Sequence, residues 1–315
     1  MNGISPAIFK ALCSDKAAQM LLDAHLSQTP TLLTDPQFSD LGFDKSTFLQ
    51  LIRDQRWSDR ESIKFYAPGR AGPSSAIWDR AILPNGSLGL DHIQHLKASK
   101  VSIYVRRLEL MHQGLRELAA ELSKTGYFTT TLAAMYSPAG AESTPNHIDP
   151  CDVIAVQLSG SKTWMIDTRP RTRNAFPGQT EPRPDSFDFA APETHITRVG
   201  DAMFIPRGFL HNAMATDQDS LHLVINLMPL TWFDVMTALL QKACDTDPEL
   251  RASVYSRRDT PVPVIDTYIA EYFTSQLADP DALRTAAERV MLERARHYKL
   301  TTIGQVFTKP SDELL

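Results

Sequence analysis

The segment VGDAMFIPRGFLH, residues 199–211, says most about the fold of this chain. Turn-forming residues at 199–201 and again at 206–208 enclose four apolar residues, 202–205, which have the composition of a short strand. Short strands divided by such turns are typical of β-barrels and jelly rolls. The second turn leads directly to His211.

A second motif, His147-Ile148-Asp149, lies between a turn-rich stretch at 137–140 and a predicted strand. Side chains two positions apart in an extended chain point the same way, so His147 and Asp149 can bind one ion. With His211 they give two imidazoles and one carboxylate, which leave three positions of an octahedral ion open, as in non-haem Fe(II) oxygenases. Zinc sites also use this ligand set, so the ligands alone do not identify the metal.

Lys162 follows the Ser159-Gly160 turn at the start of the next predicted strand. Its ammonium either enters the barrel, where it would pair with a carboxylate, or lies in solvent, as most lysines do. The neighbouring metal triad favours the first alternative, because a dicarboxylate co-substrate requires a cation.

Taken together with Ser220-Leu221-His222-Leu223, these motifs resemble the JmjC protein hydroxylases, and within them the ribosomal oxygenases of the cupin-4 type. The resemblance covers residues 130–230 approximately. It implies a double-stranded β-helix that holds Fe(II) through His147, Asp149 and His211. The implied reaction converts 2-oxoglutarate and O₂ to succinate and CO₂ while the substrate gains a hydroxyl group.

The resemblance also assigns residues to the co-substrate. Lys162 would bind the 5-carboxylate of 2-oxoglutarate, Thr144 would donate a hydrogen bond to the same group, and Asn226 would contact the co-substrate near the metal. The alternatives are a turn hydroxyl for Thr144 and a strand-end amide for Asn226. Where the ribosomal oxygenases carry a tyrosine, this chain has Met135, and the adjacent Tyr136 falls on the opposite face of the strand.

We therefore predict a mainly β core, a double-stranded β-helix of the jelly-roll or cupin type, with N-terminal α/β decoration and a C-terminal helical segment. The predicted domains are 1–125 for helical and mixed decoration, 126–230 for the JmjC/cupin barrel, and 231–315 for a helical segment that we expect to mediate dimerisation. Barrel strands are expected at 128–136, 153–158, 162–166, 202–205 and 221–227.

Outside the barrel, the patterns predict a helix that opens at Ser5-Pro6 and continues through Leu22, a helix capped by Asp44, a strand at 101–105 and a helix at 110–122. The Pro- and Arg-rich stretch 167–198 is expected to be either a functional loop or an irregular surface excursion. The C-terminal segment is expected to contain a helix capped by Thr231 and a helix from Asp279-Pro280 to about His297.

Several other residues are interpreted without a catalytic role. They are surface histidines beside a loop (His92, with Asp91, and His95), a buried thiol (Cys151), a packing or supporting histidine turned toward the interior (His222), loop arginines that meet an acidic substrate or solvent (Arg169, Arg171, Arg173, Arg183), and an apolar stripe in the core or a subunit interface (Trp232, Phe233, Met236).

Composition narrows the function. The apolar runs are too short to span a membrane, three widely spaced cysteines suggest reduced thiols in the cytoplasm, and a net charge of −5 does not favour nucleic acid as a partner. We expect an enzyme that hydroxylates a side chain of a protein or peptide, working as a homodimer. The alternatives are a hydroxylase of a small molecule or carrier-bound amino acid, and a metal-binding cupin without oxygenase turnover.

Overall fold

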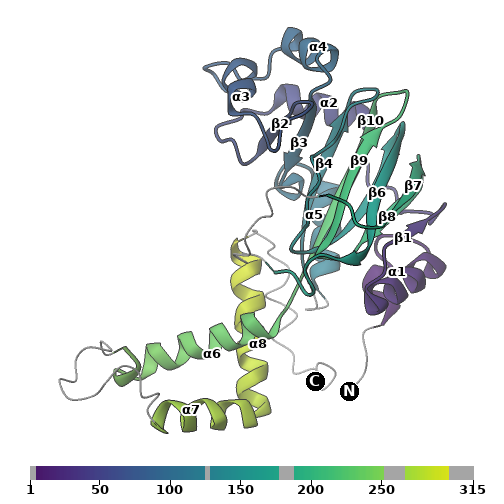
Figure 1. Ribbon diagram of the computed structural model, residues 1–315. Coiled ribbons are helices and arrows are strands. Elements are labelled where there is room, and N and C mark those ends of the chain that lie inside the picture. The colour runs from purple at the N-terminus through teal and green to yellow at the C-terminus, as the bar shows by residue number, and fades with distance from the viewer. Residues whose placement is uncertain (1–4, 125–127, 177–187, 252–266, 298–315) are drawn as a thin grey trace. The chain divides into compact units, whose positions relative to one another are not determined.

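The structure is a computed structural model that describes residues 5–124, 128–176, 188–251 and 267–297. The chain divides into two compact units (Figure 1). One comprises Ile4–Thr125 and Thr130–Met228, and the other comprises Met1–Gly3, Gly126–Thr129 and Pro229–Leu315. The domain boundaries predicted from the sequence stay predictions.

The first unit is built on two antiparallel sheets. Within the described residues, the larger sheet has seven strands in the order β1-β8-β5-β10-β4-β3-β2 and the smaller has three in the order β7-β6-β9. The strands of the larger sheet are β1 (Thr31–Leu33), β2 (Ile63–Tyr66), β3 (Ser102–Arg106), β4 (Phe128–Ser137), β5 (Asp152–Ser159), β8 (Ala202–Ile205) and β10 (Ser220–Pro229). Those of the smaller are β6 (Ser161–Pro170), β7 (Pro192–Arg198) and β9 (Phe209–Ala215). The predicted mainly β jelly-roll core is confirmed.

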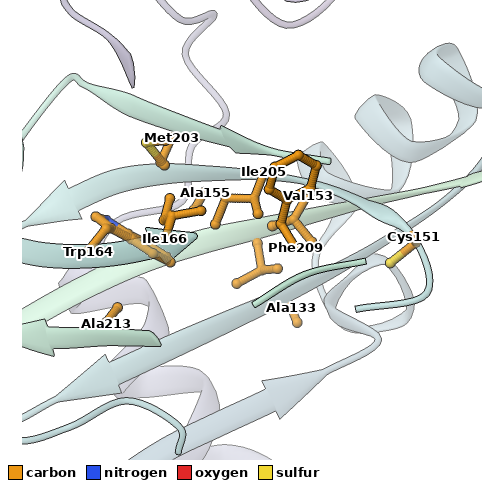
Figure 2. Packing of buried hydrophobic residues seen from close by; sticks show 11 residues of the cluster. Ala133, Cys151, Val153, Ala155, Trp164, Ile166, Met203, Ile205, Phe209 and Ala213 are labelled. Atoms are coloured by element: carbon orange, nitrogen blue, oxygen red, sulfur yellow. The ribbon is translucent and has the colours of Figure 1, made fainter. Parts of the chain in front are cut away.

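A hydrophobic core fills the space between the two sheets (Figure 2). Val153 and Ile205 come from the larger sheet, and Trp164, Ile166 and Phe209 come from the smaller one. Alternate residues along β5 and β6 point inward, as the period of two along a strand requires. The strands that carry Lys162 (β6) and His211 (β9) therefore also contribute side chains to the core between the sheets.

Several helices of the first unit begin at residues whose side chains cap them. They are α1 (Asp15–Ser27), α2 (Lys45–Asp54), α3 (Ser75–Ala81), α4 (Leu90–Ala98) and α5 (Gln113–Ser123), with short 3-10 helices at Pro6–Phe9 and Leu108–Leu110. Ser14, Asp44 and Ser74 each accept a hydrogen bond from a backbone N–H in the first turn of the following helix. The helix predicted after Asp44 is thus confirmed.

Two sequence expectations for these helices are wrong. The single helix expected from Ser5-Pro6 is a 3-10 helix followed by the separate α1, because Ser14 caps a new helix and its backbone N–H bonds to Pro36. His92 and His95 lie within α4 and not beside a loop, since Gly89 serves as the N-cap of this helix.

Both ends of the stretch 167–198 are strands, whereas residues 177–187 lie outside the described part of the chain. β6 continues to Pro170, and β7 pairs with it from Ser161↔Arg198 to Asp167↔Pro192. β7 was not predicted because it is an edge strand whose side chains are mostly exposed, so it lacks the apolar alternation of a half-buried strand. The strands β1, β2 and β9 were also missed, and β9 is the strand that carries His211.

The second unit is helical, as predicted. It contains α6 (Trp232–Thr246), a 3-10 helix (Glu249–Arg251), α7 (Thr267–Ala278) and α8 (Pro280–His297). Thr231 caps α6 in a capping box with Asp234, and Arg294 of α8 forms an ion pair with Asp234 at 2.7 Å. Val235 and Leu239 of α6 pack with Val290 of α8. None of the helices in the described ranges combines the length and the apolar character that crossing a membrane requires.

Candidate active site

A backbone pairing brings the two histidines of the predicted triad together. His147 and His211 are partners in an antiparallel bridge, in which each N–H donates to the carbonyl oxygen of the other residue at 3.1 and 3.0 Å. Further bonds from Ser143 N to Ala213 O and from Ala215 N to Ala141 O extend this pairing along β9. The segment before the His-x-Asp motif therefore runs beside the smaller sheet and fixes the position of His147.

The side chains of His147, Asp149 and His211 converge on one point. Their candidate ligand atoms all lie within 4.8 Å of one another. Asp149 Oδ2 lies 3.7 Å from His147 Nε2 and 3.5 Å from His211 Nε2. His211 is buried, whereas His147 and Asp149 are each about one-third exposed, so the point of convergence is reachable from one side.

Hydrogen bonds to the backbone orient both imidazoles. His147 Nδ1 lies 2.9 Å from the carbonyl oxygen of Pro145, and His211 Nδ1 lies 3.0 Å from that of Phe209. A proton on each Nδ1 satisfies these carbonyls and leaves the Nε2 lone pairs directed at the shared point. Burial, followed by the charge of His147, lowers the pKa of His211 to about 4, so its ring is neutral at neutral pH.

The turn between β8 and β9 leads to His211 and is hydrogen-bonded to the backbone of Asp149. Gly208 has φ +83°, and its N–H donates to the carbonyl oxygen of Asp149 at 2.9 Å. A Cβ at Gly208 would lie 1.8 Å from the carbonyl oxygen of Thr172, so only glycine fits at this position. The buried carboxylate of Asp152 accepts the N–H of Arg207 and so anchors the same turn.

Lys162 is fully buried on β6. Its ammonium donates to Ser137 Oγ at 2.9 Å and to Ser143 Oγ. No carboxylate among the described residues forms an ion pair with it, and burial holds the pKa of Lys162 well below its usual range. The sequence pattern did not identify Ser137 and Ser143, because serines in a turn-rich stretch are commonplace.

The triad lines a cavity of about 280 Å³ between the two sheets. Other lining residues were not predicted, namely Tyr66, Tyr104, Trp164 and Ser143, together with residues 71–73. Tyr104 is the cross-strand neighbour of Met135, which also lines the cavity. Only the pairing of β3 with β4 brings Tyr104 here, so no sequence motif indicated it.

The remaining predicted site residues lie at different places around this cavity. Thr144 Oγ1 is 3.3 Å from His147 Nδ1, so its nearest described polar partner is the histidine and not Lys162. Asn226 lines the cavity and donates to Thr131 Oγ1 at 3.4 Å. Tyr136 donates to Asp219 Oδ2 at 2.8 Å and is absent from the cavity wall, in agreement with the expectation that it faces the other way.

The residues interpreted without a catalytic role are placed as follows. Cys151 is buried, and burial raises the pKa of its thiol well above the usual range. His222 is buried and lines the cavity, with its ring 5.2 Å from that of Trp164. Arg171 pairs with Asp167 at 3.0 Å, Arg169 and Arg173 are exposed, and Arg183 lies outside the described residues.

Two facing antiparallel sheets with two histidines and a carboxylate between them define the metal-binding jelly rolls as the structural class. Residues 111–235 match the model of the JmjC domain. The chain therefore carries a JmjC domain, and the resemblance inferred from its sequence is confirmed.

Comparison with known proteins agrees with this assignment. The chain is 32% identical over 117 residues to the bifunctional lysine-specific demethylase and histidyl-hydroxylase NO66 of Dictyostelium discoideum, covering 35% of this chain and 22% of that protein. It is 30% identical over 169 residues to human ribosomal oxygenase 1, covering 51% and 25% of the two chains. The chain thus spans about a quarter of the length of these relatives.

Solved structures show the same fold. The Escherichia coli ribosomal oxygenase YcfD superposes with a TM-score of 0.57 at 17% identity, over 87% of this chain and 70% of that chain. A second structure of YcfD, in complex with cobalt and 2-oxoglutarate, gives the same TM-score at 15% identity, over the same shares of the two chains.

Proposed function

We propose that the protein is an Fe(II)- and 2-oxoglutarate-dependent oxygenase that hydroxylates a side chain of a protein or peptide. The observation that carries this proposal is the buried Lys162 ammonium, which has no carboxylate partner among the described residues and lies on the same sheet as His211. A buried cation without a counter-charge is unfavourable. A dicarboxylate bound in the cavity would supply the missing negative charge.

The residues present fit both the metal and the co-substrate. His147, Asp149 and His211 offer two nitrogen donors and one oxygen donor, the set that non-haem Fe(II) enzymes use. Lys162, supported by Ser137 and Ser143, would hold the distal carboxylate. The structure of YcfD with cobalt and 2-oxoglutarate supports the same pairing of metal and co-substrate in this fold. Thr144 and Asn226 are proposed as further contacts of the co-substrate.

When bound, Fe(II) and 2-oxoglutarate would activate O₂, so that one of its oxygen atoms enters succinate and the other enters the substrate. The chain's own residues fix the two Nε2 atoms through backbone hydrogen bonds and hold the co-substrate at a buried lysine. The apolar side chains of Trp164, Val153 and Val224 line the remaining wall and restrict the entry of water. The protein thus positions the groups, while the metal and co-substrate carry the redox chemistry.

The size of the cavity favours a side chain as the target. Pockets that enclose whole small molecules usually measure roughly 300–1,000 Å³, and this cavity of about 280 Å³ has to hold 2-oxoglutarate as well. A side chain that enters from outside therefore fits beside the co-substrate more readily than a whole small molecule does. The names of NO66 and ribosomal oxygenase 1 also support protein substrates.

The first experiment is succinate production from 2-oxoglutarate by the purified protein with Fe(II) and O₂. We expect slow turnover without substrate that is lost in His211→Ala and retained in His195→Ala, a matched change at a histidine outside the cavity. Candidate proteins and peptides are then screened for the mass of one added oxygen. If the wild type does not consume 2-oxoglutarate, a metal-binding cupin becomes the better account, and if only small molecules gain oxygen, the alternative substrate class is correct.

We further propose a cytoplasmic homodimer. Cys13, Cys151 and Cys244 are free, which supports a reducing compartment. Trp232 and Phe233 of α6 are 72% and 58% exposed, and such aromatic exposure on the helical unit supports contact with a second copy. Sedimentation of the wild type and of Trp232→Ala tests this: we expect the variant to become monomeric, and a monomeric wild type would contradict the proposal.

A further inference from the structure

A second cavity, of about 550 Å³, lies among α3, α4 and the segment that follows β2. Its apolar wall includes Ile77, Ala81, Leu96 and Val101. Its polar wall is basic, with Arg70, Arg80, His92 and His95. No aspartate or glutamate is among the lining residues, although the chain as a whole carries a net charge of −5. The volume lies within the range of small-molecule sites.

The arginines of this cavity differ from the other cations nearby. Arg60 pairs with Asp79 at 2.5 Å, and Arg106 pairs with Glu61 at 2.9 Å. Arg80 donates its Nε proton to the carbonyl oxygen of Ala76, and neither Arg70 nor Arg80 forms an ion pair with any described carboxylate. The guanidinium groups that face the cavity are therefore available to a ligand's anion.

One imidazole of the same wall is also without a partner. His92 Nδ1 is buried and forms no hydrogen bond with any described residue. The ring occupies the space beside Gly89, where a Cβ would lie 2.6 Å from Nδ1. This nitrogen is covered by Gly89 and is not accessible from the cavity, so the anion site is carried by the two arginines and not by this atom.

The segment 67–74 lines both cavities. Ala67, Arg70 and Ser74 line the second cavity, and residues 71–73 line the cavity that contains the metal triad. A ligand that contacts Arg70 therefore contacts the same short segment that lines the cavity of the triad.

We propose that the second cavity binds a small organic anion, a carboxylate or phosphate joined to an apolar body, and that its occupancy is transmitted to the triad's cavity through residues 67–74. The acidic group pairs with Arg70 and Arg80, and the apolar body packs against Ile77 and Leu96. The binding site stands independently of any oxygenase activity, whereas the significance of the coupling rests on the proposed function.

Calorimetric titration of the metal-free protein tests the site with hexanoate and hexyl phosphate as probes. We expect saturable binding of at least one probe, weakened about tenfold or more in Arg80→Gln and in Arg70→Gln, because charge-assisted hydrogen bonds are the strong ones. The matched control is Arg60→Gln, which removes a neighbouring guanidinium that is paired with Asp79 and absent from the wall, and its affinity should stay within twofold of the wild type.

The absence of saturable binding by both probes, or equal affinity in the wild type and Arg80→Gln, would overturn the site. Acetate and inorganic phosphate test the apolar part: if either binds as tightly as its hexyl counterpart, the apolar body is not recognised. Hydrogen exchange tests the coupling without metal or 2-oxoglutarate. The probe should slow exchange at the backbone amides of Ala71 and Gly72, and unchanged exchange at both would exclude transmission even if the anion binds.

Discussion

His147 and His211 face each other as backbone partners, each donating its N–H to the carbonyl oxygen of the other at 3.1 and 3.0 Å. The two imidazoles extend from this pair with ring centroids 4.3 Å apart. Because two hydrogen bonds hold the backbones of His147 and His211 opposite each other, strand pairing helps to fix the distance between the two ring nitrogens. The candidate metal site is thus a consequence of strand pairing.

The turn at Gly208 should be the most sensitive backbone position of the site. Gly208→Ala places a Cβ against the carbonyl of Thr172 at a positive φ, and it disturbs the bond from Gly208 N–H to Asp149. Strain and overpacking together should lower the free energy of unfolding by about 3 kcal/mol or more, with loss of metal binding. Chemical denaturation and metal content measure the two effects.

Gly200→Ala is the matched control. Gly200 has φ +93°, but a Cβ added there would have no neighbouring atom within 4 Å. Gly200→Ala should lower the free energy of unfolding by about 1 kcal/mol, because only the unfavourable φ contributes. Metal binding should be retained. Equal effects of the two substitutions would contradict the role assigned to the Gly208 turn.

Lys162 should make the stability of the ligand-free protein depend on pH. Burial depresses the pKa of Lys162 in the folded state, so between that folded-state pKa and the ordinary value of 10.5 the unfolded chain binds one proton more. The free energy of unfolding attributable to this group should then rise by about 1.4 kcal/mol per pH unit as pH rises toward 10.5 from the folded-state pKa.

Lys162→Met should remove that slope and leave the fold intact, because Ser137 and Ser143 remain hydrogen-bonded to each other and Ser137 to Ser102. The same variant should bind 2-oxoglutarate at least tenfold more weakly, since it lacks the cation for the distal carboxylate. Denaturation at several alkaline pH values, compared between wild type and variant, measures the slope. An identical slope in both proteins would show that Lys162 does not titrate in this range.

Tyr136 should affect stability and not the site. Tyr136→Phe removes the hydrogen bond to Asp219, whose carboxylate keeps Lys97 at 2.7 Å and the N–H of Ala139. We expect a loss of about 1–2 kcal/mol in the free energy of unfolding, with unchanged affinity for 2-oxoglutarate. A marked loss of that affinity would mean that Tyr136 reaches the cavity after all.

The sequence predicted the parts of the fold that have a local signal. Strands with clear apolar alternation and helices with capping residues, such as the one after Asp44, were found within a few residues. β7 and β9 were missed because their side chains mix polar and apolar residues on an edge or beside the site. Such strands are defined by their neighbours and not by their own pattern.

For the candidate site too, residues with a local sequence signal could be predicted, and residues placed by tertiary pairing could not. The ligand spacing of His147, Asp149 and His211 is visible in the sequence, and the structure brings the three together. The hydroxyl partners of Lys162 and the cavity position of Tyr104 depend on tertiary pairing between distant segments. The hydroxyl of Thr144 lies 3.3 Å from His147 Nδ1, and its assignment to the co-substrate stays a prediction.

Binding of 2-oxoglutarate to the protein under anaerobic conditions, with and without a divalent metal, tests the central claim most directly. We predict that calorimetry will show binding of one 2-oxoglutarate per chain and that this binding will require the metal. Binding should be abolished in His211→Ala and weakened in Lys162→Met. Binding that is indifferent to the metal, or unchanged in both variants, would contradict the assignment of the triad and Lys162 to one shared site.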